Sequence, residues 1–219
     1  MTIAGVQLEI DREGVVIRAA APLRILSSAV SGGGPGRAPT IVNVHVPPGF
    51  RAENAERALC DFVARRKLPA PWVGLLTAAL TENAETATES AGGLTATAIT
   101  TVGLSHPSSA GLSEAVVASA LSTINTIVIV DAVPDPAAMV NLVMTVTEVK
   151  AVALVEAGVR TPTGDPASGT SSDAVVIAAT DRGARCEFGG PVSELGFVAA
   201  RATRRALTRG IERWLRDHP

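Results

Sequence analysis

One stretch of the chain, from Ala137 to Ala157, limits the fold more than any other because it has the length of a long helix and is apolar on nearly every side. Pro136 suits the first turn of a helix and Asp135 its N-cap, while Gly158 suits its C-terminal end. A helix that is hydrophobic all round is buried. The sequence therefore predicts a helix that starts near Pro136, ends near Glu156 and is covered on more than one face.

Short runs of β-branched and alternating apolar residues predict strands on both sides of this helix. The clearest is Ile124 to Val130, which ends at Asp131. The other predicted strands cover residues 6–10, 15–18, 23–30, 40–46, 73–80, 94–104 and 173–180. Helical periodicity predicts two more helices, at residues 52–67 and 193–215. Residues 105–122, rich in Ser, Ala and Gly, are either a linker or a short helix.

The order of these elements indicates the fold class. No internal repeat and no clear linker divides the chain, so residues 1–219 are expected to form a single domain. Hydrophobic residues make up 47% of the chain, which is enough to bury a sizeable core. The mixture of strands and helices predicts the α/β class, with α+β as the alternative. We expect a sandwich in which helices pack on a mixed β-sheet.

The composition disfavours several classes of function. The net charge of −2 argues against general binding of nucleic acids or membrane surfaces. Aromatic residues make up only 3% of the chain, which disfavours a stacking site for single-stranded nucleic acid. No apolar run reaches the roughly 18 uncharged residues of a membrane span, and the N-terminus has no signal-peptide pattern. The protein is therefore expected in the cytoplasm, without a membrane or nucleic-acid partner.

The common catalytic and metal-binding motifs are absent from the sequence. The three histidines, His45, His106 and His218, are far apart in the chain. Cys60 and Cys186 form neither a disulfide framework nor a metal-binding motif. No metal site is therefore expected.

Three polar segments have two interpretations each. Asn141, Thr145 and Glu148 line up along the apolar helix, either as a solvated face or as groups that need partners or a ligand. The segment from Gly169 to Asp173 is either a polar turn or part of a site at the mouth of a strand. The glycine-rich residues 32–36 either cradle an anion or form a flexible loop.

Seven blocks of sequence follow one another in a characteristic order between residue 25 and about residue 205. They are Ser27–Gly34 with Ile41–Asn43, Val73–Ala79, Thr100–Ser105, Thr123–Asp131, Val140-Asn141 with Thr147–Ala151, Gly164–Ala174, and Gly189–Pro191 with Leu195-Gly196. In these blocks the chain resembles the adenosylcobinamide amidohydrolase (CbiZ) family. Val44-His45 after Asn43, and His106-Pro107 after Ser105, depart from the family pattern.

The resemblance implies an enzyme that hydrolyses the amide between aminopropanol and the corrin ring of adenosylcobinamide. The product, adenosylcobyric acid, would re-enter cobamide (vitamin B12) synthesis as part of corrinoid salvage. Cobalt and the adenosyl group arrive with this small-molecule corrinoid substrate, so no separate cofactor is implied. The alternative function is that of a non-catalytic corrinoid-binding protein. Apolar, Ala-rich helices are also compatible with a homodimer.

Amide hydrolysis needs an activated nucleophile, stabilisation of the oxyanion and a proton for the leaving amine. Glu148 is the predicted general base for water, because burial in the apolar helix would strengthen it as a base. Asp173 would orient the water or a hydroxyl, and Lys150 would neutralise the oxyanion or pair with Asp173. In a rival mechanism, Thr170 or Ser171 is a covalent nucleophile, with cleavage of the chain before Thr170 as a variant.

Substrate contacts are predicted for the glycine-rich loop and for several polar side chains. Backbone N–H groups of the glycine-rich loop would bind the substrate amide or the oxyanion. The residues predicted to contact substrate are Gly32, Gly33, Gly34, Asn43, Thr77, Asn125, Asn141 and Ser171.

Overall fold

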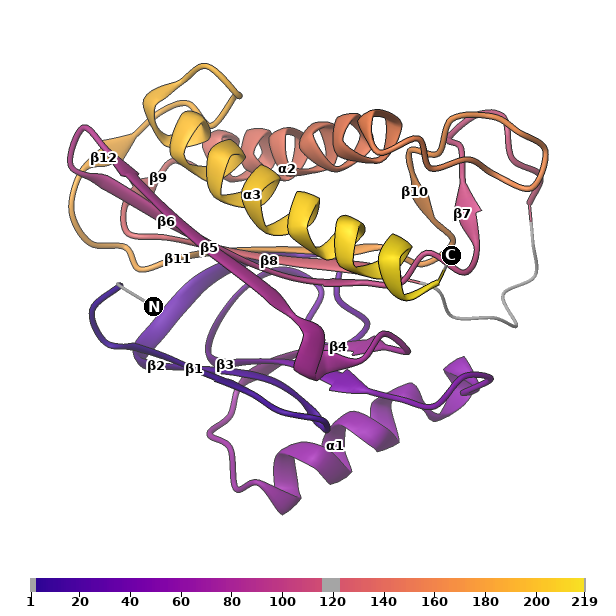
Figure 1. Ribbon diagram of the computed structural model, residues 1–219. Coiled ribbons are helices and arrows are strands. Elements are labelled where there is room, and N and C mark those ends of the chain that lie inside the picture. Colours follow the sequence, from indigo (N-terminus) through magenta and orange to yellow (C-terminus); the bar gives the residue numbers. More distant parts are fainter. Residues whose placement is uncertain (1–2, 116–122, 219) are drawn as a thin grey trace.

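The computed structural model describes residues 3–115 and 123–218, and in it the chain forms four stacked layers (Figure 1). Helices α2 (Pro136–Glu156) and α3 (Glu194–Asp217) form one outer layer, and α1 (Ala55–Arg65) covers the opposite side. Between them lie the two halves of one 8-stranded β-sheet. The predicted class, a sandwich of helices on a mixed β-sheet, is confirmed.

The main sheet has the order β4-β3-β2-β11-β8-β6-β5, with β1 paired to β2. Its strands are β1 (Val6–Ile10), β2 (Gly14–Ser27), β3 (Gly34–His45), β4 (Trp72–Thr77), β5 (Glu85–Ala91), β6 (Leu94–Val102), β8 (Ile124–Val130) and β11 (Ala174–Ala179). The β3–β4 and β8–β11 pairs are parallel and the others antiparallel. Two short pairs lie outside it, β7 (Pro107–Ser108) with β10 (Gly169–Thr170) and β9 (Val133–Pro134) with β12 (Arg185–Cys186).

Strand β2 joins the two halves of the sheet because it belongs to both. Its first part pairs with β1 and β3, and its last residues pair with β3 and β11. The register shifts between Arg18 and Leu23, and such a bulge bends a strand. The bend places one half of the sheet over the other. Aliphatic side chains from both halves fill the space between them, among them Ile17, Ile41, Leu75, Ile127 and Val176.

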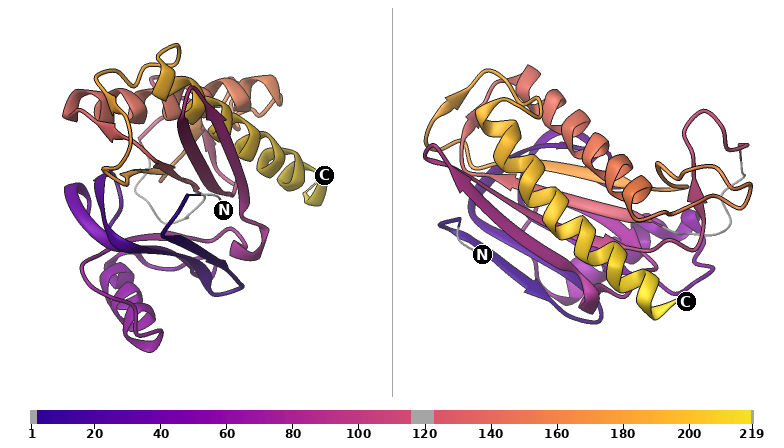
Figure 2. Two further views of the ribbon diagram at one scale, coloured as in Figure 1. Left: turned by 90° about the vertical axis from the view of Figure 1, so that its left-hand side faces the viewer. Right: turned by 45° about the horizontal axis from the view of Figure 1, so that its top comes forward.

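Helix α2 is covered on two sides and open on a third. Ala138, Leu142 and Val146 are buried, and α2 lies beside α3 across the sheet (Figure 2). By length and composition alone α2 could cross a membrane, but its contacts with β11 and α3 are those of a core helix. The large apolar side chains that face outward are about half exposed and comprise Val140, Met144, Val152 and Val155.

The start of α2 differs in one detail from the sequence-based expectation. Asp135 occupies the N-cap position but its side chain does not cap the helix. Its carboxylate instead pairs with Arg185 at 3.0 Å, because β12, which begins at Arg185, pairs with β9 just before the helix. Gly158 has a φ of 72°, which is favourable for glycine just after a helix.

Most predicted elements are confirmed to within a few residues, and three are corrected. The two strands predicted at 15–18 and 23–30 form one continuous strand, β2, because the bulge does not end its pairing with β3. Gly34 to Gly36, predicted as loop, begin β3. Strand β5 was not predicted at all. Of the undecided segment 105–122, residues 107–108 form β7 and residues 116–122 lie outside the described ranges.

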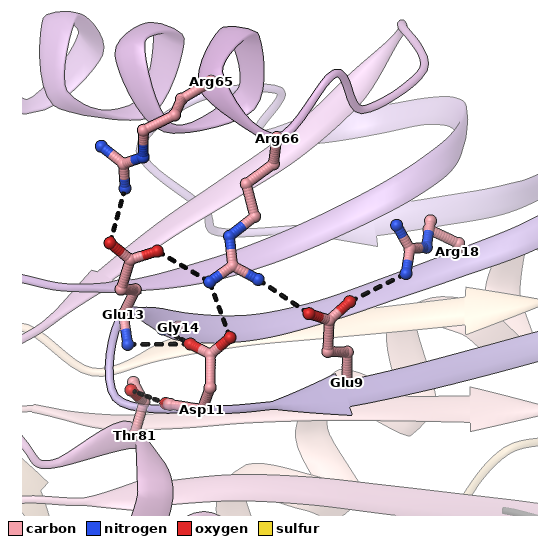
Figure 3. Close-up of polar contacts among 8 residues, drawn as sticks. All are labelled: Glu9, Asp11, Glu13, Gly14, Arg18, Arg65, Arg66 and Thr81. Atoms are coloured by element: carbon pink, nitrogen blue, oxygen red, sulfur yellow. Dashed lines mark hydrogen bonds and ion pairs between the residues drawn. The ribbon is translucent and has the colours of Figure 1, made fainter.

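A network of charged side chains ties the end of α1 to the hairpin between β1 and β2 (Figure 3). The Arg66 guanidinium donates to Glu9 at 2.9 Å, to Asp11 at 2.6 Å and to Glu13 at 2.8 Å. Burial opposes the ionisation of Asp11, but hydrogen bonds from Arg66 and from two backbone N–H groups outweigh it and lower the pKa of this carboxyl. The hydrogen bond from Arg66 and the charge of Arg65 also lower the pKa of Glu13.

The Arg66→Met variant should reveal how this network stabilises the fold. We expect its Tm at pH 7 to fall by roughly 2–4 °C, because three carboxylates lose their shared cation. A carboxyl whose pKa is lowered by folding stabilises the fold above its unfolded pKa and ceases to do so as the pH falls through its folded pKa. The difference in Tm between wild type and variant should therefore shrink from pH 7 to about pH 3. A difference that is equal at both pH values would contradict this interpretation.

Candidate active site

Asp173 is the centre of a buried polar cluster at one end of the sheet. It lies in the turn between β10 and β11. Its Oδ1 atom accepts the Ile124 N–H at 2.9 Å and the Thr170 hydroxyl. Its Oδ2 atom accepts the Thr170 N–H at 3.1 Å and the Lys150 ammonium. The structure therefore brings together Thr170, Lys150 and Asp173, three of the four residues that the sequence suggested for catalysis.

Lys150 reaches this cluster from helix α2. The side chains of Lys150 and Asp173 are each only 10% exposed. A buried ammonium group is unfavourable unless a negative charge and hydrogen bonds compensate it, and Asp173 provides both. The ion pair therefore fixes the last turns of α2 against the turn that precedes β11.

Gly169 leaves room for the ion pair. A Cβ atom at this position would lie 2.5 Å from Asp173 Oδ2 and 2.9 Å from Lys150 Nζ. Any other residue would push the two charged groups apart. Glycine lets the backbone approach so closely that both the N–H and the hydroxyl of Thr170 reach the same carboxylate.

A second polar network lies between the two halves of the sheet and leads to the Asp173 turn. Asn125 donates to Asn43 Oδ1 and to the Leu76 carbonyl, each at 2.8 Å, and Asn43 donates to the Thr101 hydroxyl at 2.9 Å. The Thr123 hydroxyl lies 2.9 Å from Asn125 Oδ1 and 2.8 Å from the Ser172 carbonyl oxygen. These bonds satisfy amides that are only 2% exposed and hold the turn in place.

An open cavity of about 460 Å³ lies beside this network. Its lining comes from the segment after β4, from the end of β6 and from the last turns of α3. Gly103 in the lining donates its N–H to the Thr123 carbonyl at 3.0 Å. The carbonyl of Ala79, another lining residue, lies 3.0 Å from His45 Nδ1. The cavity has the volume of a small-molecule site, and a whole corrinoid would have to lie partly outside it.

The expectation of a buried Glu148 is wrong. Glu148 is exposed on α2, so it lacks the burial that would have strengthened it as a base. Thr145, which the sequence placed on the same stripe, is buried and donates to the Gly189 carbonyl at 2.9 Å. The stripe lies at the boundary between the covered and the open sides of α2, and a boundary position is not visible in the sequence.

The predicted substrate-binding residues are spread over several places. Asn43 and Asn125 lie near the cluster, but they are buried and bonded to one another, so their amides serve the scaffold. Asn141 is half-buried and precedes Lys150 by nine residues, about 13 Å along the helix. Ser171 is exposed next to Thr170. Thr77 is buried, and its hydroxyl accepts the Ala79 N–H at 3.1 Å.

The glycine-rich loop packs against β4. Ser31 exchanges hydrogen bonds with Gly74 at 2.9 and 3.2 Å. A Cβ atom on Gly32 would lie 2.8 Å from the Trp72 carbonyl oxygen, and one on Gly33 would lie 2.6 Å from the Ala29 carbonyl oxygen. Gly34 starts β3 with a φ of 84°. Close packing explains Gly32 and Gly33, and their predicted contact with substrate stays a prediction.

Sequence reasoning missed Thr101 and Thr123, which complete the amide network. A signal was present, because Thr101 lies near the end of β6 and Thr123 directly precedes the apolar strand β8. Within residues 3–115 and 123–218, no group of three or more His, Cys, Asp or Glu side chains is placed to hold a metal ion.

Comparison with known families identifies one match over nearly the whole chain. A family model described as adenosylcobinamide amidohydrolase matches residues 2–219. No curated protein matches the sequence significantly.

Several solved structures are similar in fold. The PH0078 protein from Pyrococcus horikoshii OT3 is 12% identical, with a TM-score of 0.50 over 94% of this chain and 82% of its own. A beta-aminopeptidase from Burkholderia sp. is 11% identical, with a TM-score of 0.47 over 92% of this chain and 79% of its own. An L-aminopeptidase D-Ala-esterase/amidase from Ochrobactrum anthropi is 11% identical, with a TM-score of 0.40 over 94% of this chain and 82% of its own. The first match is a likeness of fold, and the likeness of the other two structures to this chain is weaker.

The buried ion pair should dominate the stability of this region. We expect Lys150→Met to lower the free energy of unfolding by about 3–5 kcal/mol, because it leaves the Asp173 carboxylate uncompensated. The double variant Lys150→Met/Asp173→Asn should lose less than the sum of the two single losses, by more than about 1 kcal/mol. Urea unfolding measures the free energy of unfolding of the two single variants and of the double variant. Glu148→Gln on the exposed side of α2 is the control and should change the value by less than about 0.5 kcal/mol. Additive losses would show that the two groups do not interact.

Proposed function

The chain belongs to the adenosylcobinamide amidohydrolase family and is a hydrolase of amide bonds, and from this premise we propose that its substrate is adenosylcobinamide. Hydrolysis of the amide that joins aminopropanol to the corrin ring gives adenosylcobyric acid and aminopropanol. The acid then re-enters cobamide synthesis, so the enzyme acts in corrinoid salvage in the cytoplasm. Cobalt and the adenosyl group belong to the substrate, and the reaction needs no separate cofactor.

The observation that carries this proposal to particular residues is the hydrogen bond from the Thr170 hydroxyl to Asp173. A threonine hydroxyl is a weak nucleophile unless a neighbouring group takes its proton. Asp173 Oδ1 is in place to do so, and Thr170 is only 8% exposed, so little water competes for the same proton. Thr170 is thus the nucleophile that the geometry supports best, ahead of the exposed Glu148 and Ser171.

The reaction then has two stages. In the first, the Thr170 oxygen bonds to the amide carbon while its proton passes to Asp173. The C–N bond breaks, the proton goes to the departing aminopropanol nitrogen, and the corrinoid acyl group remains on Thr170 as an ester. In the second stage, water attacks this ester and gives its proton to Asp173. The Thr170 oxygen leaves, takes the proton back, and adenosylcobyric acid is released.

Lys150 has two tasks in this mechanism. Its ammonium group holds Asp173 in the orientation that faces Thr170, through the hydrogen bond to the other carboxylate oxygen. Its positive charge, one carboxylate away, also stabilises the negative charge that develops on the Thr170 oxygen when the hydroxyl proton moves. Gly169 is essential to both, because a larger residue would separate Lys150 from Asp173.

Incubation of the purified protein with adenosylcobinamide, followed by mass spectrometry of the corrinoid, tests the proposal. We expect adenosylcobyric acid from the wild type and none from Thr170→Val, which keeps the size of the side chain and leaves the Lys150–Asp173 pair intact. Thr170→Ser should retain activity because it keeps a hydroxyl. Asp173→Asn should lower kcat by about 10²–10⁴-fold.

Two controls separate this mechanism from its rivals. Thr147→Val removes an exposed hydroxyl from α2 and should leave the rate unchanged. Glu148→Gln should also retain the rate. Loss of turnover in Glu148→Gln together with an active Thr170→Val would overturn the assignment of the nucleophile. Bound corrinoid without product from the wild type would indicate a binding protein.

A further inference from the structure

The cavity beside the amide network takes no part in the proposed chemistry. The described part of its wall includes a stacked pair of rings, Trp214 and His218, whose centroids are 4.4 Å apart and whose planes differ by 9°. The His218 Nδ1 atom lies 2.9 Å from the Trp214 carbonyl oxygen, which positions the imidazole over the indole. Each ring covers one face of the other, and Trp214 is half-buried while His218 is exposed, so the outer face of the imidazole is the part of the pair on which a ligand can stack.

Such a surface is unusual in this chain, which has two tryptophans and no tyrosine. Flat heteroaromatic groups bind to surfaces of this kind by stacking, and a purine is among those that stack best. Asn83 adds an amide and Asp217 a carboxylate to the same lining. An amide can pair with the edge of a base, and a carboxylate can accept hydrogen bonds from ribose hydroxyls.

The charges at the cavity favour a nucleoside over a nucleotide. The guanidinium of Arg213, another lining residue, pairs with Glu85. Glu85 also pairs with Arg209 at 3.2 Å, so two guanidinium groups share one carboxylate, and the carboxylate of Asp217 brings the sum of these four charges to zero. Little positive charge is therefore left to bind a phosphate. The cavity suits a flat base with a sugar and without a phosphate.

The distance between the cavity and Asp173 suits one substrate that spans both. Gly103 lines the cavity and donates its N–H to the Thr123 carbonyl, and the next residue, Ile124, donates its N–H to Asp173. The path from Gly103 to Asp173 thus consists of one cross-strand step, one residue along the strand and one hydrogen bond, which together amount to roughly 10 Å. In adenosylcobinamide the adenosyl group is bonded to cobalt at the centre of the ring, and the aminopropanol arm extends from the rim.

We propose that this cavity binds the adenosyl group of the substrate, with the adenine against the Trp214–His218 pair and the ribose beside Asp217. The inference rests on the proposed function, since it takes adenosylcobinamide as the substrate. It makes Trp214, His218 and Asp217 specificity-determining residues that distinguish adenosylated corrinoids from those with a small upper ligand.

Binding of 5′-deoxyadenosine, the adenosyl group without the corrinoid, tests the subsite independently of turnover. Tryptophan fluorescence is the readout, and the variants assign the signal. In Trp72→Phe the fluorescence comes from Trp214 alone, and saturable quenching should persist. In Trp214→Leu the fluorescence comes from Trp72, and the quenching should be lost. The proposal would be overturned if 5′-deoxyadenosine did not quench the wild type, or if the quenching survived in Trp214→Leu. Quenching by aminopropanol and not by 5′-deoxyadenosine would also overturn it.

Steady-state kinetics provide the second test. With adenosylcobinamide, His218→Ala and Asp217→Asn should raise KM by about tenfold and leave kcat unchanged, because each removes a binding contact remote from the reacting amide. With cobinamide that carries cyanide as its upper ligand, neither variant should change KM. Equal increases of KM for both substrates would contradict an adenosyl subsite.

The two proposals can fail separately. His218→Ala and Asp217→Asn change exposed side chains near the end of α3, so these two variants preserve the core even if Trp214→Leu disturbs it. Quenching by 5′-deoxyadenosine without any hydrolysis would refute the reaction and support the subsite. Hydrolysis with identical KM values for adenosylated and cyano substrates in wild type and variants would support the reaction and refute the subsite.

Discussion

The ion pair between Lys150 and Asp173 is the contact on which the candidate site depends. It places a positive charge from an apolar helix beside a carboxylate in a turn, and each of the two side chains is only 10% exposed. Without its partner either charge would be strongly unfavourable in this position. The ion pair therefore fixes both α2 and the turn before β11. This turn also presents the Thr170 hydroxyl to the Asp173 carboxylate. A glycine at position 169 is the steric condition for this arrangement.

The sheet provides the frame in which this contact forms. The bulge in β2 folds the sheet over itself, so that β3 and β8, which are not neighbours in the strand order, meet through Asn43 and Asn125. Buried amides of this kind are stable only when their hydrogen bonds are made, and they specify one alignment of the two halves. That alignment sets the end of β6 beside the cavity. The Asp173 cluster and the cavity are thus held by one scaffold.

Much of the fold could be predicted from the sequence because strong periodic patterns identify helices and buried strands wherever they pack. Strand β5 could not, because it alternates Thr, Ala and Glu at the edge of the sheet, where little apolar side-chain surface marks it. The candidate site was predicted in part. Lys150 of the apolar helix and Asp173 of the polar segment before a strand were both predicted to take part in catalysis, with a pairing of the two as one option, and the structure pairs them. Glu148 was misjudged because helical spacing gives relative directions and does not show which side of α2 is covered. The place of Trp214 and His218 in the lining of the cavity was not predicted, because more than 100 residues separate Trp214 from Gly103 in the same lining.

The central claim is that the amide is cleaved through an ester on Thr170, and hydroxylamine tests it most directly. An ester on the enzyme would be captured by this added nucleophile as readily as by water. The account predicts that the wild-type enzyme, given adenosylcobinamide and hydroxylamine, forms the corrinoid hydroxamate together with the acid, at a ratio that follows the hydroxylamine concentration while aminopropanol is still released. Formation of the acid alone at every hydroxylamine concentration would mean that water attacks the amide directly, and would contradict the account.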